Sequence, residues 1–295
     1  MERSKDSALS SVLLATDLDG RCDRALDRAA QLAKGWDAEL IVLHVVEAAA
    51  RDAGWSNAQI SDAVHEEVAA ALGDQTVTFR VVIERGDVAT AILNASTHHG
   101  CGLLVSGIAR LNRFGPNILG STLTAVLRSA RVPVLMVKNR VRTSYARIVV
   151  GTDFSEPSRR ALETALRMFP SADCALLNAS RVPFSGFASS SDHREAHLAA
   201  QRSEANAFLD GVSWPSGARR DIPVRLELGS PTEAINSHIL ANDCDLAVFG
   251  THGHGGFRKA LMGSVAEMLM VSVDCDVMVV PADVEMANRS ADDPA

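Results

Sequence analysis

The chain contains an internal repeat, and this repeat limits its architecture more than any other feature. The segment Ser11–Asp17 (SVLLATD) returns as Arg147–Asp153 (RIVVGTD), 136 residues later. Two further segments return 143 residues later: Gly100–Gly107 as Asp243–Gly250, and Gly120-Ser121 as Gly263-Ser264. Because this spacing is the size of a domain, the repeat predicts two similar domains in the 295-residue chain.

The change of spacing by seven residues indicates an insertion in the second copy. The stretch Phe184–Arg194 is rich in Ser and contains Gly, which is typical of a loop. We expect a first domain over residues 8–140 and a second over residues 145–283. The polar residues 284–295 are expected to form a flexible tail.

Within each copy, short apolar runs alternate with segments of helical periodicity, as in parallel strands joined by crossover helices. Five runs predict the strands of the second copy: Ile148–Thr152, Ala175–Ala179, Val224–Leu228, Leu246–Phe249 and Val277–Val280. The sequence therefore predicts an α/β protein with two tandem doubly wound, Rossmann-like domains. Each is expected to be a five-stranded parallel sheet of order 3-2-1-4-5, flanked by helices.

Several helices have recognisable start signals and apolar faces. Ser230-Pro231 places a serine at an N-cap and a proline in the first turn, with Glu233 spaced to reach back to the cap amide. Ser155-Glu156-Pro157 opens another helix. Two apolar stripes are interpreted as core: Ala161, Leu162, Ala165, Leu166 and Phe169 in the second copy, and Ile60, Val64, Val68 and Leu72 in the first.

Composition excludes several classes of partner. The 29 Lys and Arg residues are scattered and are outnumbered by 36 Asp and Glu, so a nucleic-acid footprint is not supported. No apolar run approaches the roughly 18 residues that cross a bilayer. We therefore expect a soluble, cytoplasmic protein that binds neither nucleic acid nor membrane.

The cysteines and histidines do not form a recognisable metal or disulfide motif. The five cysteines are spread along the chain without a C-x-x-C pair, so reduced thiols are expected. His98-His99-Gly100-Cys101 and Asp243-Cys244-Asp245 could be metal ligands, but they fall at predicted helix ends. We interpret them as solvated caps and core thiols, and we expect no metal held by the protein alone.

A glycine-rich segment of the second copy, Gly250–Ser264, follows a predicted strand and precedes a predicted helix. Glycines let the chain turn sharply, and free main-chain amides at a helix start can bind an anion. The alternative is that the glycines only shape a loop. The segment lacks the Gly-Lys-Ser/Thr of a Walker A loop, and it follows a fourth strand, not the first strand of a dinucleotide fold. His252-Gly253-His254 also lacks the spacing of a nucleotidyl-transferase pair.

Thr152-Asp153 ends the predicted first strand of the second copy. An aspartate at this position can accept hydrogen bonds from a base or a ribose, or it can cap the following helix. In a sheet of order 3-2-1-4-5 the ends of strands one and four are neighbours, at the point where strand order reverses. Asp153 and Gly250 are therefore expected to face one pocket.

Thr152-Asp153-Phe154-Ser155, together with G-x2-G-x9-G-S at Gly250, Gly253, Gly263 and Ser264, resembles the ATP-binding pattern of the universal stress protein family. The two copies resemble its tandem members over roughly residues 11–281, and the resemblance implies an adenine nucleotide alpha hydrolase-like fold. It also implies that Asp153 and Ala179, together with Thr152, hold the nucleoside. Gly253, Gly263 and Ser264, together with Gly250, would hold the triphosphate. Asn178-Ala179 departs from the His44-Val45 of the first copy.

The first copy departs further from this pattern. Its corresponding residues, which the resemblance implies form a weaker site, are Asp17, Val45, Gly107, Arg110, Gly120 and Ser121. Arg110 stands where the second copy has Gly253, so its side chain would fill the space of a phosphate; the alternative is that it pairs with one. Pro116 removes a further amide. We therefore expect ATP to bind mainly to the second domain.

The resemblance implies a nucleotide-binding stress-response protein with at most slow ATP hydrolysis. No catalytic residue is predicted, because no nucleophile beside a base and an orienting group is evident. Mg²⁺ could join Asp153 and the phosphates. The family's pairing through last strands implies an intramolecular pseudo-dimer of the two domains, and a homodimer stays open. The alternatives are a scaffold of the same fold that binds no nucleotide, and a slow ATPase or nucleotidyl enzyme.

Overall fold

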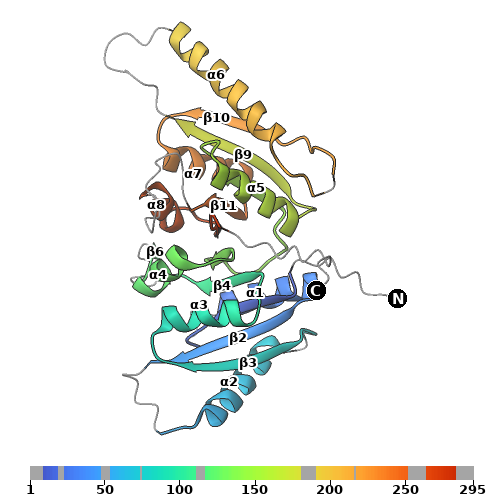
Figure 1. Cartoon of the computed structure of the whole chain (residues 1–295), viewed down its shortest axis with the longest axis vertical. Coiled ribbons are helices and arrows are strands. Elements are labelled where there is room, and N and C mark those ends of the chain that lie inside the picture. Colours follow the sequence, from blue (N-terminus) through green and yellow to red (C-terminus); the bar gives the residue numbers. More distant parts are fainter. Residues whose placement is uncertain are drawn as a thin grey trace, which may run out of the picture. The chain divides into compact units, whose positions relative to one another are not determined.

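The computed structural model describes residues 9–18, 23–47, 54–73, 75–110, 117–180, 191–215, 217–251 and 264–283 (Figure 1). Its contacts divide the chain into two units. Unit 1 takes in the residues up to Gly107 and Ser121–Val141, and unit 2 takes in Ile108–Gly120 and Arg142–Ala282.

Unit 1 is a parallel sheet with helices on both faces. Its strands are β1 (Ser11–Ala15), β2 (Glu39–Val46), β3 (Phe79–Arg85), β4 (Leu103–Gly107) and β7 (Val134–Val137), in the order β3-β2-β1-β4-β7. Its helices are α1 (Asp23–Trp36), α2 (Asn57–Leu72), α3 (Val88–His98) and α4 (Ser121–Ser129). α1 contacts α2 and α3 contacts α4, as expected when right-handed crossovers place one pair on each face of the sheet.

Unit 2 repeats this arrangement, and the expected strand order 3-2-1-4-5 is confirmed in both units. Its strands are β8 (Arg147–Gly151), β9 (Asp173–Ser180), β10 (Val224–Leu228), β11 (Leu246–Gly250) and β12 (Asp276–Val280), in the order β10-β9-β8-β11-β12. Its helices are α5 (Glu156–Met168), α6 (Ser191–Asp210), α7 (Pro231–Asn242) and α8 (Ser264–Ser272).

A short antiparallel hairpin of β5 (Ala109–Arg110) and β6 (Asn117–Ile118) comes from the first copy in sequence. It packs with unit 2, where β6 contacts α8. The first copy of the repeat therefore contributes one segment to the packing of unit 2.

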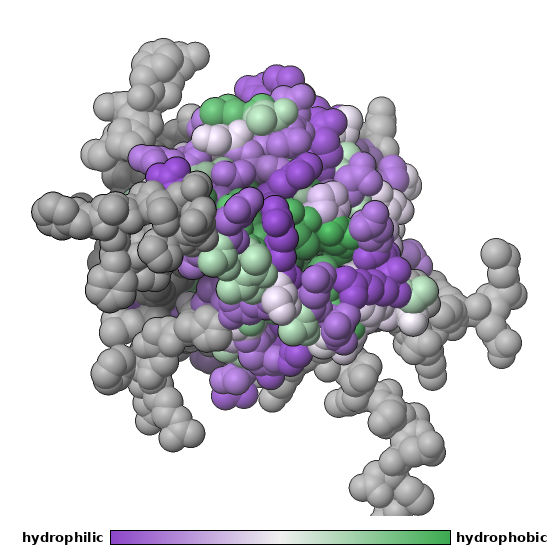
Figure 2. Space-filling model, turned by 90° about the horizontal axis from the view of Figure 1, so that it is seen from above, coloured by the Kyte–Doolittle hydropathy of each residue, from purple (hydrophilic) through white to green (hydrophobic). Residues whose placement is uncertain are grey.

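The inner strands are apolar because helices cover both of their faces. Residues 12–14 of β1 and 149–150 of β8 are fully buried. The edge strand β10 instead alternates, and it exposes Arg225 and Glu227. Charged side chains on an edge strand discourage pairing with another chain. Figure 2 looks from the top of Figure 1, where α6 and β10 lie, and shows a largely hydrophilic face with apolar surface in small patches.

The helix start signals are confirmed in position and corrected in detail. α5 and α7 begin directly after Ser155 and Ser230, each with a proline in the first turn, but neither serine side chain makes a capping hydrogen bond to its helix. The capping box expected with Glu233 is therefore wrong. A capping box that the sequence analysis missed lies on α2, between Ser56 and Gln59.

The remaining expectations for local structure are largely met. The α5 stripe is buried throughout, and in α2 three of the four stripe residues are buried while Ile60 is half-buried. The predicted loop 184–194 is wrong at its end, because α6 already begins at Ser191. Residues 181–190 lie outside the described part of the chain.

The thiols behave as core groups. Cys101, Cys174, Cys244 and Cys275 are buried and form no disulfide with one another, and Cys22 lies outside the described residues. Burial raises the pKa of the Cys174 and Cys244 thiols to about 11. In the described ranges no group of His, Cys, Asp and Glu could hold a metal ion, and no helix there is both long enough and apolar enough to cross a membrane.

Candidate functional site

A tight turn follows β8 at the carboxyl edge of the unit 2 sheet. The Thr152 hydroxyl accepts a hydrogen bond from the Phe154 amide at 2.8 Å. Asp153 Oδ1 accepts from both the amide and the hydroxyl of Ser155, at 3.1 Å and 2.5 Å. The Asp153 carboxylate is therefore anchored at the start of α5, close to the capping role that the sequence left open.

The turn holds one residue in a left-handed conformation in each unit. Phe154 has φ +61° and its counterpart Leu18 has φ +62°, and the Leu18 amide donates to the Thr16 hydroxyl at 3.0 Å. A bulky residue at positive φ is disfavoured by roughly 1–2 kcal/mol. Such backbone strain concentrates at functional sites, where the surrounding structure enforces it. Its presence after both first strands marks the Thr-Asp turn as the shared special feature of the two units.

The second strand of each unit fastens this turn. Asn178 Nδ2 donates to the Thr152 carbonyl at 2.9 Å, and His44 Nδ1 lies 3.2 Å from the Thr16 carbonyl. The register of the strands shows that Asn178 and His44 are equivalent. The Thr152 amide donates a hydrogen bond to the carbonyl of Leu177, the residue before Asn178, and the Thr16 amide donates to the carbonyl of Leu43, the residue before His44. Ala179 and Val45, predicted from the sequence to hold a nucleoside, follow directly.

Unit 2 adds a polar network that the sequence analysis missed. Gln201 on α6 donates to Asn178 Oδ1 at 2.8 Å and to Ser180 Oγ at 2.7 Å. Ser180 Oγ also lies 3.0 Å from His197 Nε2. This serine and histidine form a pair of the kind used in nucleophilic catalysis, but within the described part of unit 2 no third side chain orients the His197 ring. The burial of Gln201 was the signal for this network, and it is seen only in the folded chain.

The end of β11 meets the end of β8, as the strand order predicted. β8 and β11 are paired in register, which brings Thr152, Asp153 and Gly250 to the edge of the sheet where the strand order reverses. A Cβ on Gly250 would lie 2.7 Å from the carbonyl oxygen of Pro157. Gly250 therefore allows α5 to approach the sheet closely, a packing role in addition to any role in the loop.

The predicted phosphate loop is only partly described. Gly253 and Gly263 lie outside the described residues, and Ser264 is the first residue of α8. In the first copy the equivalents are placed as follows: Gly107 ends β4, Arg110 pairs its main chain with Asn117 in the β5-β6 hairpin, Gly120 precedes α4, and Ser121 opens it. Each helix that follows the loop thus begins at the predicted Gly-Ser.

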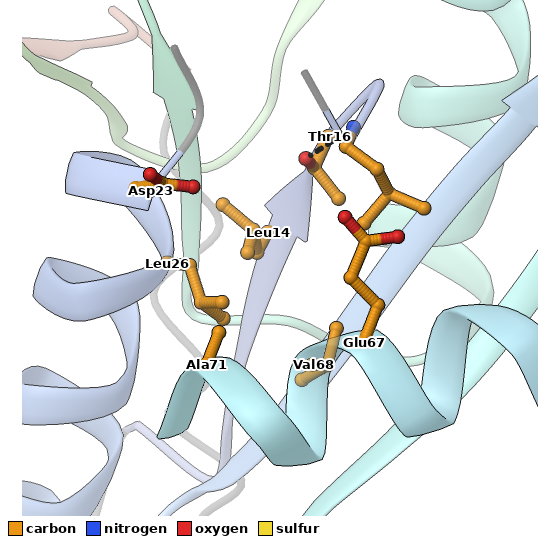
Figure 3. A pocket seen from close by; sticks show the side chains of 8 residues that line it. Leu14, Thr16, Asp23, Leu26, Glu67, Val68 and Ala71 are labelled. Carbon is orange, nitrogen blue, oxygen red and sulfur yellow. Dashed lines mark hydrogen bonds between the residues drawn. The ribbon is translucent and has the colours of Figure 1, made fainter. Parts of the chain in front are cut away.

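A small cavity opens beside the Thr-Asp turn of unit 1 (Figure 3). Its volume is about 30 Å³. Its walls are mostly apolar, and carboxylates lie at both sides, Asp23 on α1 and Glu67 on α2, the latter pointing toward Thr16. The residues that line it are Leu14, Thr16, Leu18, Asp23, Leu26, Glu67, Val68 and Ala71.

In unit 2 aromatic side chains meet at the corresponding corner. Phe154 stands where unit 1 has Leu18, and its ring packs edge-on against Phe208 of α6, with centroids 5.6 Å apart. Phe208 is buried. The two units therefore share the turn but fill the space between β1 or β8 and the second helix differently.

Comparison with known proteins places both halves in one group. The sequence model of the universal stress protein family matches residues 9–138 and 144–281. A universal stress protein of Mycolicibacterium smegmatis is 26% identical over 302 residues, which cover 91% of this chain and 96% of that protein. The match therefore extends through both copies of the repeat.

Solved structures agree in fold. A universal stress protein from Archaeoglobus fulgidus superposes with a TM-score of 0.67 at 21% identity, covering 94% of this chain and 99% of its own. A Pseudomonas aeruginosa protein described as a universal stress protein superposes with a TM-score of 0.70 at 22% identity, covering 95% and 96%. At these identities the likeness establishes the two-domain α/β fold.

Proposed function

The chain belongs to the universal stress protein family through both of its halves, and we propose that unit 2 binds ATP at the carboxyl edge of its sheet as part of a stress response. One observation carries the proposal. Where the strand order reverses, the fastened Thr152-Asp153 turn and the end of β11 share one edge, and α8 begins at Ser264 after the glycine-rich segment. This edge is where open α/β sheets bind ligands.

Each predicted residue has a place in this proposal. Thr152, Asp153 and the main chain at Ala179 would hold the base and ribose, because these three lie at the ends of the adjacent strands β8 and β9. Gly250, Gly253, Gly263 and Ser264 would hold the phosphates with main-chain amides and the positive end of the α8 dipole. The anchoring of Asp153 by Ser155 fits a carboxylate held ready for a ribose hydroxyl.

Mg²⁺ would bind through the phosphates, with Asp153 as its protein ligand. Mg²⁺ prefers few carboxylates together with phosphate oxygens, and the described residues offer no group of three metal ligands. Turnover would be slow at most, because the described edge of unit 2 provides one serine-histidine pair without an orienting partner. A phosphate-release assay with Mg²⁺ tests this expectation.

Unit 1 is proposed to bind ATP weakly or not at all. Arg110 stands at the position of Gly253, and two carboxylates, Asp23 and Glu67, line the small cavity beside the Thr-Asp turn of unit 1. Carboxylates near the turn also oppose an anionic ligand. An association of the two domains through their last strands and a homodimer stay predictions.

A matched pair of substitutions tests which unit binds. Asp153→Asn keeps an acceptor for Ser155 but removes the charge, so titration with ATP should show at least a tenfold weaker Kd with the fold retained. Asp17→Asn makes the same change in unit 1 and should leave the Kd unchanged. Equal effects of both substitutions, or none of either, would contradict the assignment to unit 2.

The second candidate function is a scaffold of the same fold that binds no nucleotide. It is favoured by the hydrogen bonds from Ser155 to Asp153, which give this residue a structural reason to be present. The two functions separate in one experiment. Chromatography of the small molecules released from denatured pure protein should yield an adenine nucleotide; its absence, with no binding in titration, would favour the scaffold.

A further inference from the structure

A chain of hydrogen bonds connects helix α6 to the carboxyl edge of the unit 2 sheet. Gln201 Nε2 lies 2.8 Å from Asn178 Oδ1 and 2.7 Å from Ser180 Oγ, and Asn178 Nδ2 lies 2.9 Å from the Thr152 carbonyl oxygen. Asn178 and Ser180 flank Ala179 on β9. One side chain of α6 therefore holds both neighbours of Ala179 and, through Asn178, the turn that carries Asp153.

The donors and acceptors of this network fit one arrangement. The Gln201 amide group has two N–H donors, and both are used, one on Asn178 and one on Ser180. The Ser180 oxygen accepts from Gln201, so its own hydrogen is available to His197 Nε2 at 3.0 Å. Glutamate has the same size but, when ionised, no donors, so it cannot replace Gln201 in this network.

Stability alone gives a poor reason for Gln201. Its side chain is buried, with 6% of its surface exposed, and its Oε1 has no hydrogen-bond partner among the residues that the structure describes. A buried acceptor without a partner disfavours folding. The neighbouring buried positions on α6, Ala205, Phe208 and Leu209, are apolar, so an apolar side chain would suit the packing. What the amide supplies is the placement of the two β9 side chains.

Unit 1 fastens its turn without the second helix. α2 buries Val64, Val68 and Leu72, and His44 reaches the Thr16 carbonyl directly with Nδ1. In the described part of unit 1 no α2 side chain hydrogen-bonds to His44. In unit 1 the His44 ring alone contacts the carbonyl of the turn, whereas in unit 2 the Asn178 amide does so and is itself held by Gln201 of α6.

We propose that Gln201 is a positioning residue for the nucleoside end of the unit 2 site. By holding Asn178 and Ser180 it sets the main chain at Thr152 and Ala179, where base and ribose would bind. The assignment rests on the proposed function of unit 2, and it makes α6 part of the binding apparatus although Gln201 itself touches no ligand.

The test compares Gln201→Met with the wild type in the full-length chain. Methionine keeps the length of the side chain and removes both donors. The Kd for ATP should rise about tenfold, the effect of one or two lost hydrogen bonds. Amide hydrogen exchange should quicken about tenfold at 151–155 and 177–180 and stay unchanged in β12. Gln201→Glu should act in the same direction, and Gln75→Met on the surface of unit 1 should change neither readout.

A rescue variant separates positioning from a general structural role. Asn178→His combined with Gln201→Met gives β9 a ring that can reach the Thr152 carbonyl directly, as His44 reaches the Thr16 carbonyl in unit 1, and should restore the Kd to within about threefold. Wild-type affinity and exchange in Gln201→Met would overturn the proposal. Faster exchange throughout unit 2 without rescue would also overturn it. If the wild type binds no ATP, the proposed function fails, and the exchange pattern alone still decides whether Gln201 sets this edge.

Discussion

Replacing Gly250 by alanine should destabilise the protein through packing against α5. An ideal Cβ at this position lies 2.7 Å from the Pro157 carbonyl oxygen and 2.8 Å from its carbon, so the first turn of α5 or the end of β11 has to move. The φ of Gly250 lies outside the left-handed region, so backbone strain is not the cause. Overpacking of this kind costs about 1–3 kcal/mol, and since the clash is with main chain, about 2 kcal/mol is expected.

Equilibrium unfolding in urea, followed by circular dichroism, measures this loss as a lower midpoint at an unchanged slope. Gly35→Ala is the matched control, because it makes the same change in α1 with nothing within 4 Å of the new Cβ. It should stabilise by about 0.5–1 kcal/mol, since alanine favours a helix. Wild-type stability in Gly250→Ala would refute the packing argument. Lost ATP binding at wild-type stability would assign Gly250 to the ligand instead.

Two further predictions concern the described parts of both units. Hydrogen bonds from Thr90 lower the pKa of Asp87, so its stabilising effect is complete above the ordinary value of 3.8 and is lost as pH falls below it. Asp87→Asn should remove this part of the acid dependence of unfolding. Cys174 and Cys244 should resist alkylation at pH 8 in the folded protein, because their thiols stay protonated; rapid labelling seen by mass spectrometry would contradict their burial.

The sequence was sufficient for the fold because the fold depends on local patterns that occur twice. The predicted strand Leu246–Phe249 lies within β11, and the predicted strand Val224–Leu228 has the same bounds as β10. Apolar runs of this length between helices have few other solutions in an α/β protein. The start of α6 at Ser191 was missed, because loop composition in a serine-rich stretch does not exclude a helix.

The candidate site was predictable only where its residues adjoin in sequence. The Thr152-Asp153 turn follows from its position at a strand end. The link from Gln201 to Asn178 joins residues on different elements, and its partners are defined only by packing. The role of Gly250 was also incomplete in the sequence, because its closest neighbour, Pro157, belongs to the helix after another strand. Side-chain networks and close approaches of this kind require the tertiary structure.

The most direct test of ATP binding by unit 2 is calorimetric titration of the full-length protein with ATP and Mg²⁺. The wild type should bind one ATP per chain, Gly253→Arg should abolish binding, and Gly35→Arg, which adds the same charge on α1, should leave it unchanged. Two equivalent sites per chain, or an unaltered affinity in Gly253→Arg, would contradict binding at the glycine-rich segment of the second copy.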